Sequence, residues 1–444
     1  MKPNKKNYVI INKGGYMTEK LRCYFVIDMK SFFASVECAE RGLDAMTTNL
    51  VVADADRTEK TICLAVSPSM KKLGVKNRCR LFQVPKNIDY IIAKPRMQKY
   101  IEYAAKIYSI YLKYISKDDI HVYSIDECFL DVTDYLAIYK IKARDFAKKL
   151  MQEINDKLHI PSTCGIGTNL YLAKIALDIT AKHSPDRIGW LTEEKFIKEL
   201  WHHKPLKDFW IISDGTINRL LNHGITDMAG IANYDADSLY KEFGINAELL
   251  IDHAWGRETC LMSDIKNYRS KSKSISNSQI LPRGYSFDDA KVVLNEMIQD
   301  GCYRLARENK VAKLIHVFIG YEGIKSQKEL VKGTRRMKFA SNLYSRVNPY
   351  AESIFDEVVD KKKLVRRLGF DLSDLMDDEY EQYDFFTDVN ALMKEKKLTK
   401  TLLNLKDRYG KNAILKGLDY MPNATQRERN QTIGGHNSGT DENA

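Results

Sequence analysis

The sequence predicts an α+β protein built from several domains. The chain has 444 residues, enough for two to four domains with hydrophobic cores. Between residues 23 and 187, apolar runs typical of strands alternate with segments that have the apolar spacing of helices. A polar and basic stretch at 263–275 then separates a helical region from a second region of mixed helix and strand.

The first elements have clear local signals. Residues 23–29, CYFVIDM, form a continuous apolar run, which predicts a strand covered on both faces. A helix is expected over 31–42, where a glycine closes it. Farther along, a strand leads into a short helix that is capped by Ser67, begins at a proline and stops at Gly74.

Three longer helices are expected in the same region, with strands between them. Helical apolar spacing covers residues 96–115, 141–158 and 170–183. Residues 122–132 and a short segment within 161–169 predict strands. This order predicts a sheet with helices on one face and acidic residues at the strand ends.

The second half of the chain changes character twice. Residues 190–262 are predicted to be all helical, and 263–275 to be a linker. Residues 276–374 predict a second domain of helices and strands. The last 70 residues have few apolar side chains, so we expect a tail with one transient helix, and residues 1–20 read as a flexible arm.

The charge of the chain is unevenly distributed. The net charge is +11, and residues 265–370 alone hold 22 Lys or Arg against 11 Asp or Glu. Residues 371–388 then carry eight acids and no base. A basic body indicates a polyanionic partner, with nucleic acid the leading candidate, while a solvated surface that aids solubility stays open.

The cysteines and the apolar runs indicate the compartment. The eight cysteines form no Cys-x-x-Cys pair and no Cys/His cluster, which argues against structural zinc and is typical of a reducing compartment. No apolar stretch approaches the roughly 20 residues that cross a bilayer, and no signal peptide follows the basic N-terminus. We therefore expect a cytoplasmic protein without a membrane partner.

An acidic pair lies inside an apolar run at residues 122–132, VYSIDECFLDV. Asp126 and Glu127 are adjacent there, and Asp28 lies at the end of the first predicted strand. Three carboxylates from neighbouring strands would make an oxygen-rich site that suits Mg²⁺ or Mn²⁺ rather than zinc. A turn, or a strand end held by a salt bridge, is the competing interpretation of the pair alone.

Three segments with their order and spacing resemble one enzyme family. FVIDMKSFFASVE (25–37), SIDECFLDV (124–132) and CGIGTNLYLAKIALDITAKH (164–183) are similar to motifs of the Y-family translesion DNA polymerases. The chain most resembles the UmuC-like branch that Gram-positive bacteria, their phages and their plasmids carry. The resemblance covers about residues 21–390.

The resemblance implies a polymerase shaped like a right hand. The four domains would leave no length for a proofreading exonuclease, so low fidelity and short synthesis runs are expected. The implied parts are an N-terminal arm (1–20), a palm (21–40 and 95–187), fingers (41–94), a thumb (188–262), a linker (263–275), a little finger (276–374) and a tail (375–444) with a clamp-binding peptide.

The resemblance also implies the reaction. Asp28, Asp126 and Glu127 match the family's catalytic, metal-binding acids, and the carbonyl of Met29 would be a further ligand. Two Mg²⁺ ions, or Mn²⁺, would assist the addition of deoxynucleotides to a primer 3′-hydroxyl opposite damaged template. This is translesion synthesis in DNA repair and SOS-type damage tolerance.

Five residues match nucleotide-binding positions of the family. Phe33 matches the steric gate, whose ring leaves no room for a ribose 2′-hydroxyl, and Phe32 would lie alongside it. Lys71 and Lys182 would contact the triphosphate, and the helix start at Ser67 would add N–H donors. No tyrosine follows Ser67, in contrast to the commoner family pattern, so one phosphate contact is in doubt.

Two residues on the helix at 170–183 receive other roles. Lys174 is expected to serve the surface or DNA, and Asp178 to be a structural residue that pairs within the palm.

The resemblance places DNA contacts in the thumb and the little finger. Arg335, Arg336 and Lys338, in TRRMKFA, are expected to meet template phosphates, although a solvated strand face is an alternative. In the thumb, Ile212 and Ser213 stand where the family's hairpin has glycines, so we expect weaker binding of the DNA backbone there.

A short motif near the C-terminus suggests a partner. QYDFF, with Gln382, Phe385 and Phe386, resembles the peptide that binds the bacterial sliding clamp. Packing of the two rings back onto the little finger is the alternative. The resemblance leaves open a need for an accessory subunit or a recombinase filament.

Two other functions remain open at this point. A catalytically idle DNA-binding scaffold would not need the acids at 28, 126 and 127. An enzyme with a palm like that of nucleotide cyclases would not need the basic domain or the clamp peptide.

Overall fold

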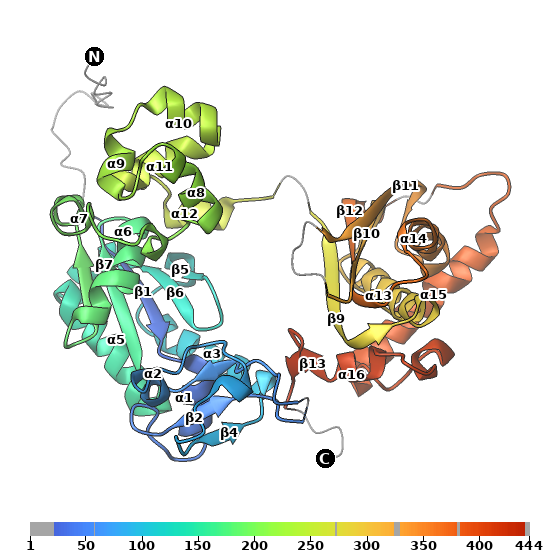
Figure 1. The fold of residues 1–444 in the computed structure, drawn as a ribbon, viewed down its shortest axis with the longest axis horizontal. Coiled ribbons are helices and arrows are strands. Elements are labelled where there is room, and N and C mark those ends of the chain that lie inside the picture. Colours follow the sequence, from blue (N-terminus) through green and yellow to red (C-terminus); the bar gives the residue numbers. More distant parts are fainter. Residues whose placement is uncertain (1–21, 57, 271–272, 324–328, 380–381, 440–444) are drawn as a thin grey trace. The chain divides into compact units, whose positions relative to one another are not determined.

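The computed structural model divides the chain into two units, Met1–Tyr268 and Arg269–Ala444 (Figure 1). It describes residues 22–439 apart from 57, 271–272, 324–328 and 380–381. The predicted arm at 1–20 lies outside the described residues. The linker predicted at 263–275 begins too early, because helix α12 (Met262–Asn267) occupies its first part. Met262 and Ile265 of this helix pack in an apolar cluster of the first unit.

A five-stranded sheet forms the centre of the first unit. The apolar strand β1 lies in its middle, as its uninterrupted run predicts, and pairs antiparallel with β6 and β7. The sheet order is β5 (Ile120–Val122), β6 (Glu127–Asp131), β1 (Tyr24–Met29), β7 (Ser162–Gly167) and β8 (Ile188–Leu191).

Helices cover both faces of this sheet, which corrects the prediction of helices on one face. On one side, Phe25 and Ile27 pack with α1 (Phe32–Ala39), α3 (Met97–Leu112) and α5 (Ala143–Leu158). On the other side, Tyr24 and Val26 pack under α6 (Leu170–Ile175) and the π-helical turn η3 (Ala176–Thr180). The alternate residues of β1 are apolar on both sides, so both faces need a cover.

Residues 41–94 fold around a small sheet with the order β3 (Ala65–Val66), β2 (Leu50–Val52) and β4 (Ile91–Ala93). The predicted short helix is confirmed as α2 (Pro68–Lys72). The Ser67 side chain caps it by accepting a hydrogen bond from the Met70 N–H, and Gly74 follows with φ of +86°.

Residues 193–267 are helical, as predicted, but the boundary at 187 is wrong. Strand β8 (Ile188–Leu191) pairs in parallel with β7 and therefore completes the central sheet. The helices that follow are α7 (Glu193–Leu200), η5 (Leu206–Asp208), α8 (Asp214–Asn222), α9 (Met228–Asn233), α10 (Ala236–Phe243), α11 (Asn246–Ala254) and α12. Smaller elements of this unit are η1 (Leu81–Gln83), η2 (Lys117–Asp119), α4 (Thr133–Ile138) and η4 (Ala181–His183).

The second unit is a four-stranded sheet covered by helices. The strands β11 (Val331–Ser341), β10 (Lys310–Tyr321), β12 (Val365–Asp377) and β9 (Ile275–Tyr285) lie in this order and are all antiparallel. The helices α13 (Phe287–Arg307) and α14 (Tyr344–Val358) pack on one face.

The C-terminal segment is folded, contrary to the predicted tail with a transient helix. Helix α15 (Val389–Tyr409) buries Leu392 and Leu403, and it is followed by η7 (Gly417–Tyr420), α16 (Gln426–Asn430) and the hairpin β13 (Thr432–Ile433) and β14 (His436–Asn437). The buried Glu296 carboxylate of α13 accepts hydrogen bonds from the Thr425 and Gln426 N–H groups at the start of α16. Apolar contacts, the buried Glu296 carboxylate and ion pairs such as Lys396–Asp378 and Arg307–Asp407 thus hold a segment of low apolar content.

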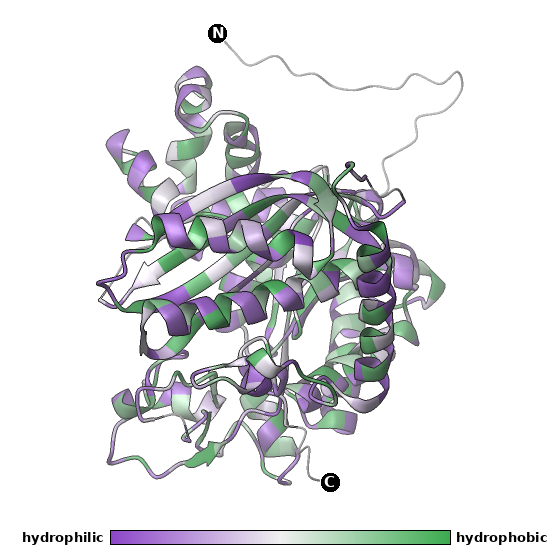
Figure 2. Ribbon diagram, turned by 90° about the vertical axis from the view of Figure 1, so that its right-hand side faces the viewer, coloured by the Kyte–Doolittle hydropathy of each residue, from purple (hydrophilic) through white to green (hydrophobic). Residues whose placement is uncertain are grey.

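Figure 2 shows hydrophilic and hydrophobic residues side by side along most helices, as expected of helices that cover a sheet with one face. Within the described part of the chain, no helix combines the length and the apolar character needed to cross a membrane.

Candidate active site

The acidic run at 122–132 forms a hairpin rather than one strand. Strands β5 and β6 pair antiparallel, and a turn connects them because the N–H groups of Tyr123 and Ser124 both donate to the Glu127 carbonyl. The Ser124 hydroxyl donates to Asp126 Oδ1 at 2.7 Å. Asp126 therefore lies in the turn, and Glu127 begins β6.

The sheet register brings the three predicted acids together. Asp28 and Glu127 are directly opposite each other on β1 and β6, and the Met29 N–H donates to the Asp126 carbonyl at 3.0 Å. Burial raises the pKa of Asp28 to about 7, and the neighbouring Asp126 and Glu127 carboxylates add to the rise. Their mutual repulsion indicates a site that favours a cation.

Lys174 supplies a cation within the protein itself. Its Nζ lies 2.8 Å from Glu127 Oε1 and 3.2 Å from Asp178 Oδ1, and the residue is only 7% exposed. Burial alone would lower the pKa of Lys174, but the carboxylates of Asp178 and Glu127 raise it above its ordinary value. The prediction of a surface or DNA role for Lys174 is thus wrong, whereas Asp178 pairs within this unit as predicted.

The donor set fits a hard divalent cation in its chemistry. Asp28, at the end of β1, and Asp126 and Glu127, at the start of β6, offer carboxylate oxygens. Such oxygens are the ligand type that Mg²⁺ prefers. The three side chains are not preassembled, because among the described residues no three or more Asp, Glu, His or Cys side chains form a group that could hold an ion. Lys174 holds Glu127, with Nζ 2.8 Å from Oε1 and 2.9 Å from Oε2.

The two adjacent phenylalanines at the start of α1 have different environments. Phe32 is 2% exposed and belongs to the core, whereas Phe33 is partly exposed. The Phe33 ring stacks on the buried Tyr100 of α3, with centroids 4.6 Å apart and an angle of 26° between the planes. Phe33 is therefore the one of the two rings that a ligand could contact.

The predicted phosphate-binding residues divide into one structural residue and two cations. Ser67 is fully buried, and its Oγ accepts hydrogen bonds from the N–H groups of Met70 and Leu50. Only the backbone at this helix start could therefore contact a ligand. Partial burial lowers the pKa of Lys71, and nearby Asp28 and Asp126 oppose this while Lys182 adds to it. Lys71 thus lies near the acidic site, and Lys182 lies near Lys71.

The loop before α8 lacks glycine but keeps a glycine-like backbone. Ile211 has φ of +73°, a rare conformation for a β-branched residue, and its side chain is 54% exposed. Ser213, which stands where the family's hairpin has a glycine, caps α8. Its hydroxyl accepts a hydrogen bond from the Thr216 N–H at 3.2 Å. The unusual backbone thus lies one residue before the predicted position, Ile212.

The three basic residues of β11 do not share one face. Arg336 and Lys338 are exposed on one side of the strand, whereas Arg335, the residue before Arg336, points to the other side and pairs with Glu357 of α14. Arg336 lies 3.0 Å from Asp374, and Lys338 lies 2.7 Å from Asp384. Each cation therefore already has an acidic partner within its own unit.

The segment with the predicted clamp peptide is anchored, and its two rings are free. Arg346 donates to the Gln382 carbonyl at 3.2 Å, and Lys338 pairs with Asp384, which Thr387 also contacts. Phe385 and Phe386 are 105% and 96% exposed, so the alternative of packing on the second unit is wrong for these rings.

Sequence reasoning missed Lys174 and Glu37 as parts of this region. Glu37 is fully buried on α1, one turn after Phe33, and Arg96 and Tyr100 bind its carboxylate. The available signal was the same in both cases. A single charged residue inside an otherwise apolar helix indicates a buried and paired charge.

A comparison with family models matches both units. The model described as the impB/mucB/samB family matches residues 27–178, and the model of the C-terminal domain of that family matches residues 272–385. The first match spans all three acids, and the second spans the four-stranded sheet and ends at Phe385.

Several curated protein sequences resemble the chain over nearly its full length. A Bacillus subtilis protein named for UV-damage repair, UvrX, is 31% identical over 93% of this chain and 97% of its own length. DNA polymerase IV 2 of Bacillus subtilis is 30% identical over 94% of this chain and 99% of its own length. DNA polymerase IV 2 of Halalkalibacterium halodurans is 30% identical over 93% and 98%.

A solved structure has the same fold. A chimera of the Y-family DNA polymerases Dbh and Dpo4 superposes with a TM-score of 0.63, at 23% identity, over 80% of this chain and 99% of its own.

Proposed function

The chain belongs to the impB/mucB/samB family, in the UmuC-like branch of the Y-family DNA polymerases, and from this membership we propose that it copies damaged template. It is a DNA-directed DNA polymerase that performs translesion synthesis. The proposal extends to low fidelity, to two-metal catalysis and to SOS-type damage tolerance.

One observation carries the proposal for the active site. Asp28 and Glu127 are cross-strand partners, and the Asp126 carbonyl accepts a hydrogen bond from the Met29 N–H. The Asp126 and Glu127 carboxylates add to the raised pKa of Asp28, and such a cluster of like charges is unfavourable unless a cation compensates it. The sheet around them would be the palm, and residues 41–94 the fingers.

Asp28, Asp126, Glu127 and the Met29 carbonyl would hold two divalent ions, Mg²⁺ or Mn²⁺. Bound ions of this type supply charge neutralisation at the triphosphate and activation of the primer 3′-hydroxyl. Lys174 has a supporting role, since its ammonium keeps Glu127 oriented at the sheet edge.

The nucleotide pocket would lie beside these acids. Phe33, with its partly exposed ring at the start of α1, would exclude a 2′-hydroxyl, and the buried Phe32 would support it from the core. Lys71 and Lys182 would meet the triphosphate, because Lys71 interacts electrostatically with Asp28 and Asp126, and Lys182 lies near Lys71.

The second unit would be the little finger, and primer–template DNA its partner. Arg336 and Lys338 are exposed on one strand, and template phosphates would replace their present partners Asp374 and Asp384. Arg335 would contribute less, because it faces α14.

A sliding clamp is the second proposed partner. Gln382, Phe385 and Phe386 would bind it, since two fully exposed rings on an anchored turn are suited to a partner's apolar pocket.

Primer extension tests the active-site proposal. Purified protein, Mg²⁺ and four deoxynucleotides should extend a primer on an undamaged template and past a single lesion. Asp126→Ala/Glu127→Ala should lose at least about 1,000-fold in rate, the scale expected when groups that stabilise transition-state charge are removed.

Asp118→Ala is a matched control, because it removes an exposed acid in η2, the turn that leads into β5. It should retain activity. Equal extension by the double variant would show that these acids do not catalyse polymerisation. No extension by the wild type under these conditions would refute the proposed activity itself. Chelation by EDTA should stop the reaction, and Mg²⁺ or Mn²⁺ should restore it.

A further inference from the structure

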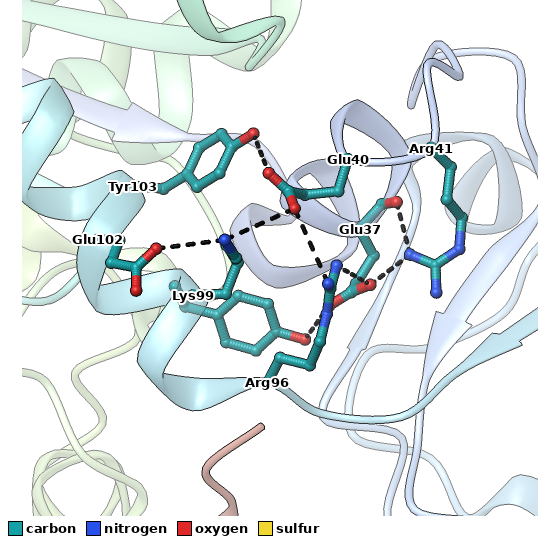
Figure 3. Close-up of polar contacts among 8 residues, drawn as sticks. Glu37, Glu40, Arg41, Arg96, Lys99, Glu102 and Tyr103 are labelled. Carbon is teal, nitrogen blue, oxygen red and sulfur yellow. Dashed lines mark hydrogen bonds and ion pairs between the residues drawn. The ribbon is translucent and has the colours of Figure 1, made fainter. Parts of the chain in front are cut away.

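A polar network around a buried carboxylate connects α1 to the start of α3 (Figure 3). Glu37, which is fully buried, lies at its centre, one helical turn after Phe33. The Tyr100 hydroxyl donates to Glu37 Oε1 at 2.9 Å, and the Tyr100 ring is the surface on which Phe33 stacks. The network therefore reaches Phe33 through a single aromatic contact.

Two arginines fix the central carboxylate. Arg96 donates to both oxygens of Glu37, from Nε at 2.9 Å and from Nη2 at 2.8 Å. Arg41 donates to Oε2 of the same carboxylate and to the Glu37 main-chain carbonyl. Burial alone would raise the pKa of Glu37, but these hydrogen bonds hold it below its ordinary value, so the group is ionised. A planar, bidentate pair fixes the carboxylate in orientation as well as in position.

A buried ion pair of this kind is a costly way to join two helices, since apolar residues of similar volume would often stabilise them as well. What the network adds is orientation. Tyr100 is fully buried, its ring is packed, and its hydroxyl is bound to an immobile acceptor, so the ring has one allowed position. Phe33 is partly exposed on its other side and has no such restraint of its own.

We propose that Tyr100 is a positioning residue that fixes the Phe33 ring, and that Glu37 with Arg96 and Arg41 fixes Tyr100, so that the network sets the discrimination between deoxyribose and ribose. The inference rests on the proposed role of Phe33 as the gate. It assigns a specificity function to four residues of which none faces the acids of the active site. If the Phe33 ring can move slightly, it no longer excludes the 2′-hydroxyl. The residue that holds the ring in place therefore matters as much as the size of the ring.

The outer part of the network provides a control. Tyr103 lies on α3 one turn from Tyr100, is also buried, and donates its hydroxyl to Glu40 at 2.8 Å. Lys99 and Arg96 are each 3.8 Å from Glu40. Tyr103→Phe thus removes a tyrosine–glutamate hydrogen bond from the same helix pair and leaves the ring behind Phe33 unchanged.

The test measures kcat/KM for one deoxynucleotide and its matched ribonucleotide on an undamaged primer–template, in single-nucleotide insertion. Tyr100→Leu should lower the ratio of the two values by about tenfold or more, the discrimination that a change in pocket shape controls. The change should come from faster ribonucleotide insertion, with deoxynucleotide kcat nearly unchanged. Tyr100→Phe, which removes the hydroxyl bound to Glu37, should lower the ratio in the same direction by a smaller factor, and Tyr103→Phe should leave it unchanged.

Glu37→Gln keeps the shape of the acid and removes its charge, and it should lower the ratio in the same direction as Tyr100→Leu. This variant decides the question if Tyr100→Leu does not fold. Phe33→Ala provides the reference, and Phe33→Ala/Tyr100→Leu should discriminate no worse than Phe33→Ala alone, because Tyr100 acts only through the gate.

The outcomes separate the two proposals. If Phe33→Ala admits ribonucleotides while Tyr100→Leu and Glu37→Gln keep the wild-type ratio, the positioning role is wrong and the gate stands. If Phe33→Ala leaves the ratio unchanged, the gate role fails, and the positioning role fails with it. Equal losses for both sugars would show that the network is merely structural.

Discussion

At the scale of single residues, the described part of the first unit contains two buried glutamates, each with a cation from a distant segment. Glu127 has Lys174, 47 residues away, and Glu37 has Arg96, 59 residues away. A carboxylate without such a partner would be neutralised or excluded from the interior. The two pairs have different consequences: Lys174 contacts a candidate metal ligand directly, whereas Arg96 acts on the nucleotide pocket only through Tyr100.

The charge of Glu37 predicts a pH dependence of stability. Its pKa is lower in the folded than in the unfolded protein, so the stabilisation is present above pH 4 to 5 and is lost as the pH falls further. Thermal melting of wild type and Glu37→Gln between pH 7 and pH 3 should show a wild-type advantage at neutral pH that shrinks on acidification. A difference in Tm that does not change with pH would contradict an ionised Glu37.

At the scale of elements, the packing of α6 and η3 on β7 places Lys174. A Cβ atom at Gly165 would lie 2.1 Å from the Ala173 carbonyl oxygen, and one at Gly167 would lie 2.1 Å from the Ala173 nitrogen. Both neighbours are backbone atoms and cannot turn aside. The two glycines therefore allow the helix to approach the strand closely enough for Lys174 to reach Glu127.

Gly165→Ala should destabilise the first unit by about 1–3 kcal/mol, because the added methyl group forces the helix away from the strand. A loss of about 2–12 °C in Tm is expected for a unit of this size, at roughly 2–4 °C per kcal/mol. Primer extension should fall as well, since Lys174 moves from Glu127.

Gly215→Ala serves as the control for this substitution. Its added Cβ would be 3.8 Å from the nearest heavy atom, Ser213 Oγ, and it lies inside α8, where alanine is preferred to glycine. It should leave Tm unchanged or raise it slightly. A Gly165→Ala protein as stable and active as this control would refute the close-packing argument.

At the scale of the whole molecule, the candidate chemistry and the candidate partner surfaces belong to different units. The acids, the gate and its network lie in Met1–Tyr268, whereas the basic strand and the exposed rings of Phe385 and Phe386 lie in Arg269–Ala444. Lys338 and Asp384 connect the last two features within the second unit. Binding of a clamp should therefore be separable from catalysis.

Phe385→Ala/Phe386→Ala should reduce retention on an immobilised sliding clamp by about tenfold or more, as expected when aromatic anchors of an interface are removed. Extension of a short primer–template without clamp should be unaffected. Met393→Ala removes another exposed apolar side chain, on α15, and should be retained like the wild type. Equal retention of the double variant would exclude this segment as the clamp site.

Signals within short windows of the sequence predicted much of the fold. The apolar run of β1, the cap and stop of the helix at Ser67 and Gly74, and the periodic helices α3 and α5 were all confirmed. The α+β class and the family followed from such segments. Strand alternation, capping and helical spacing depend on neighbouring residues, so the sequence alone determines them.

Contacts between distant segments decided the rest. The tertiary structure turned residues 122–127 into a hairpin, added β8 to the central sheet, and docked the C-terminal segment on Glu296. It also made Lys174 a buried partner of Glu127 instead of a surface residue. These outcomes depend on which surfaces meet and which charges lose their water, and neither is a property of a single stretch of chain.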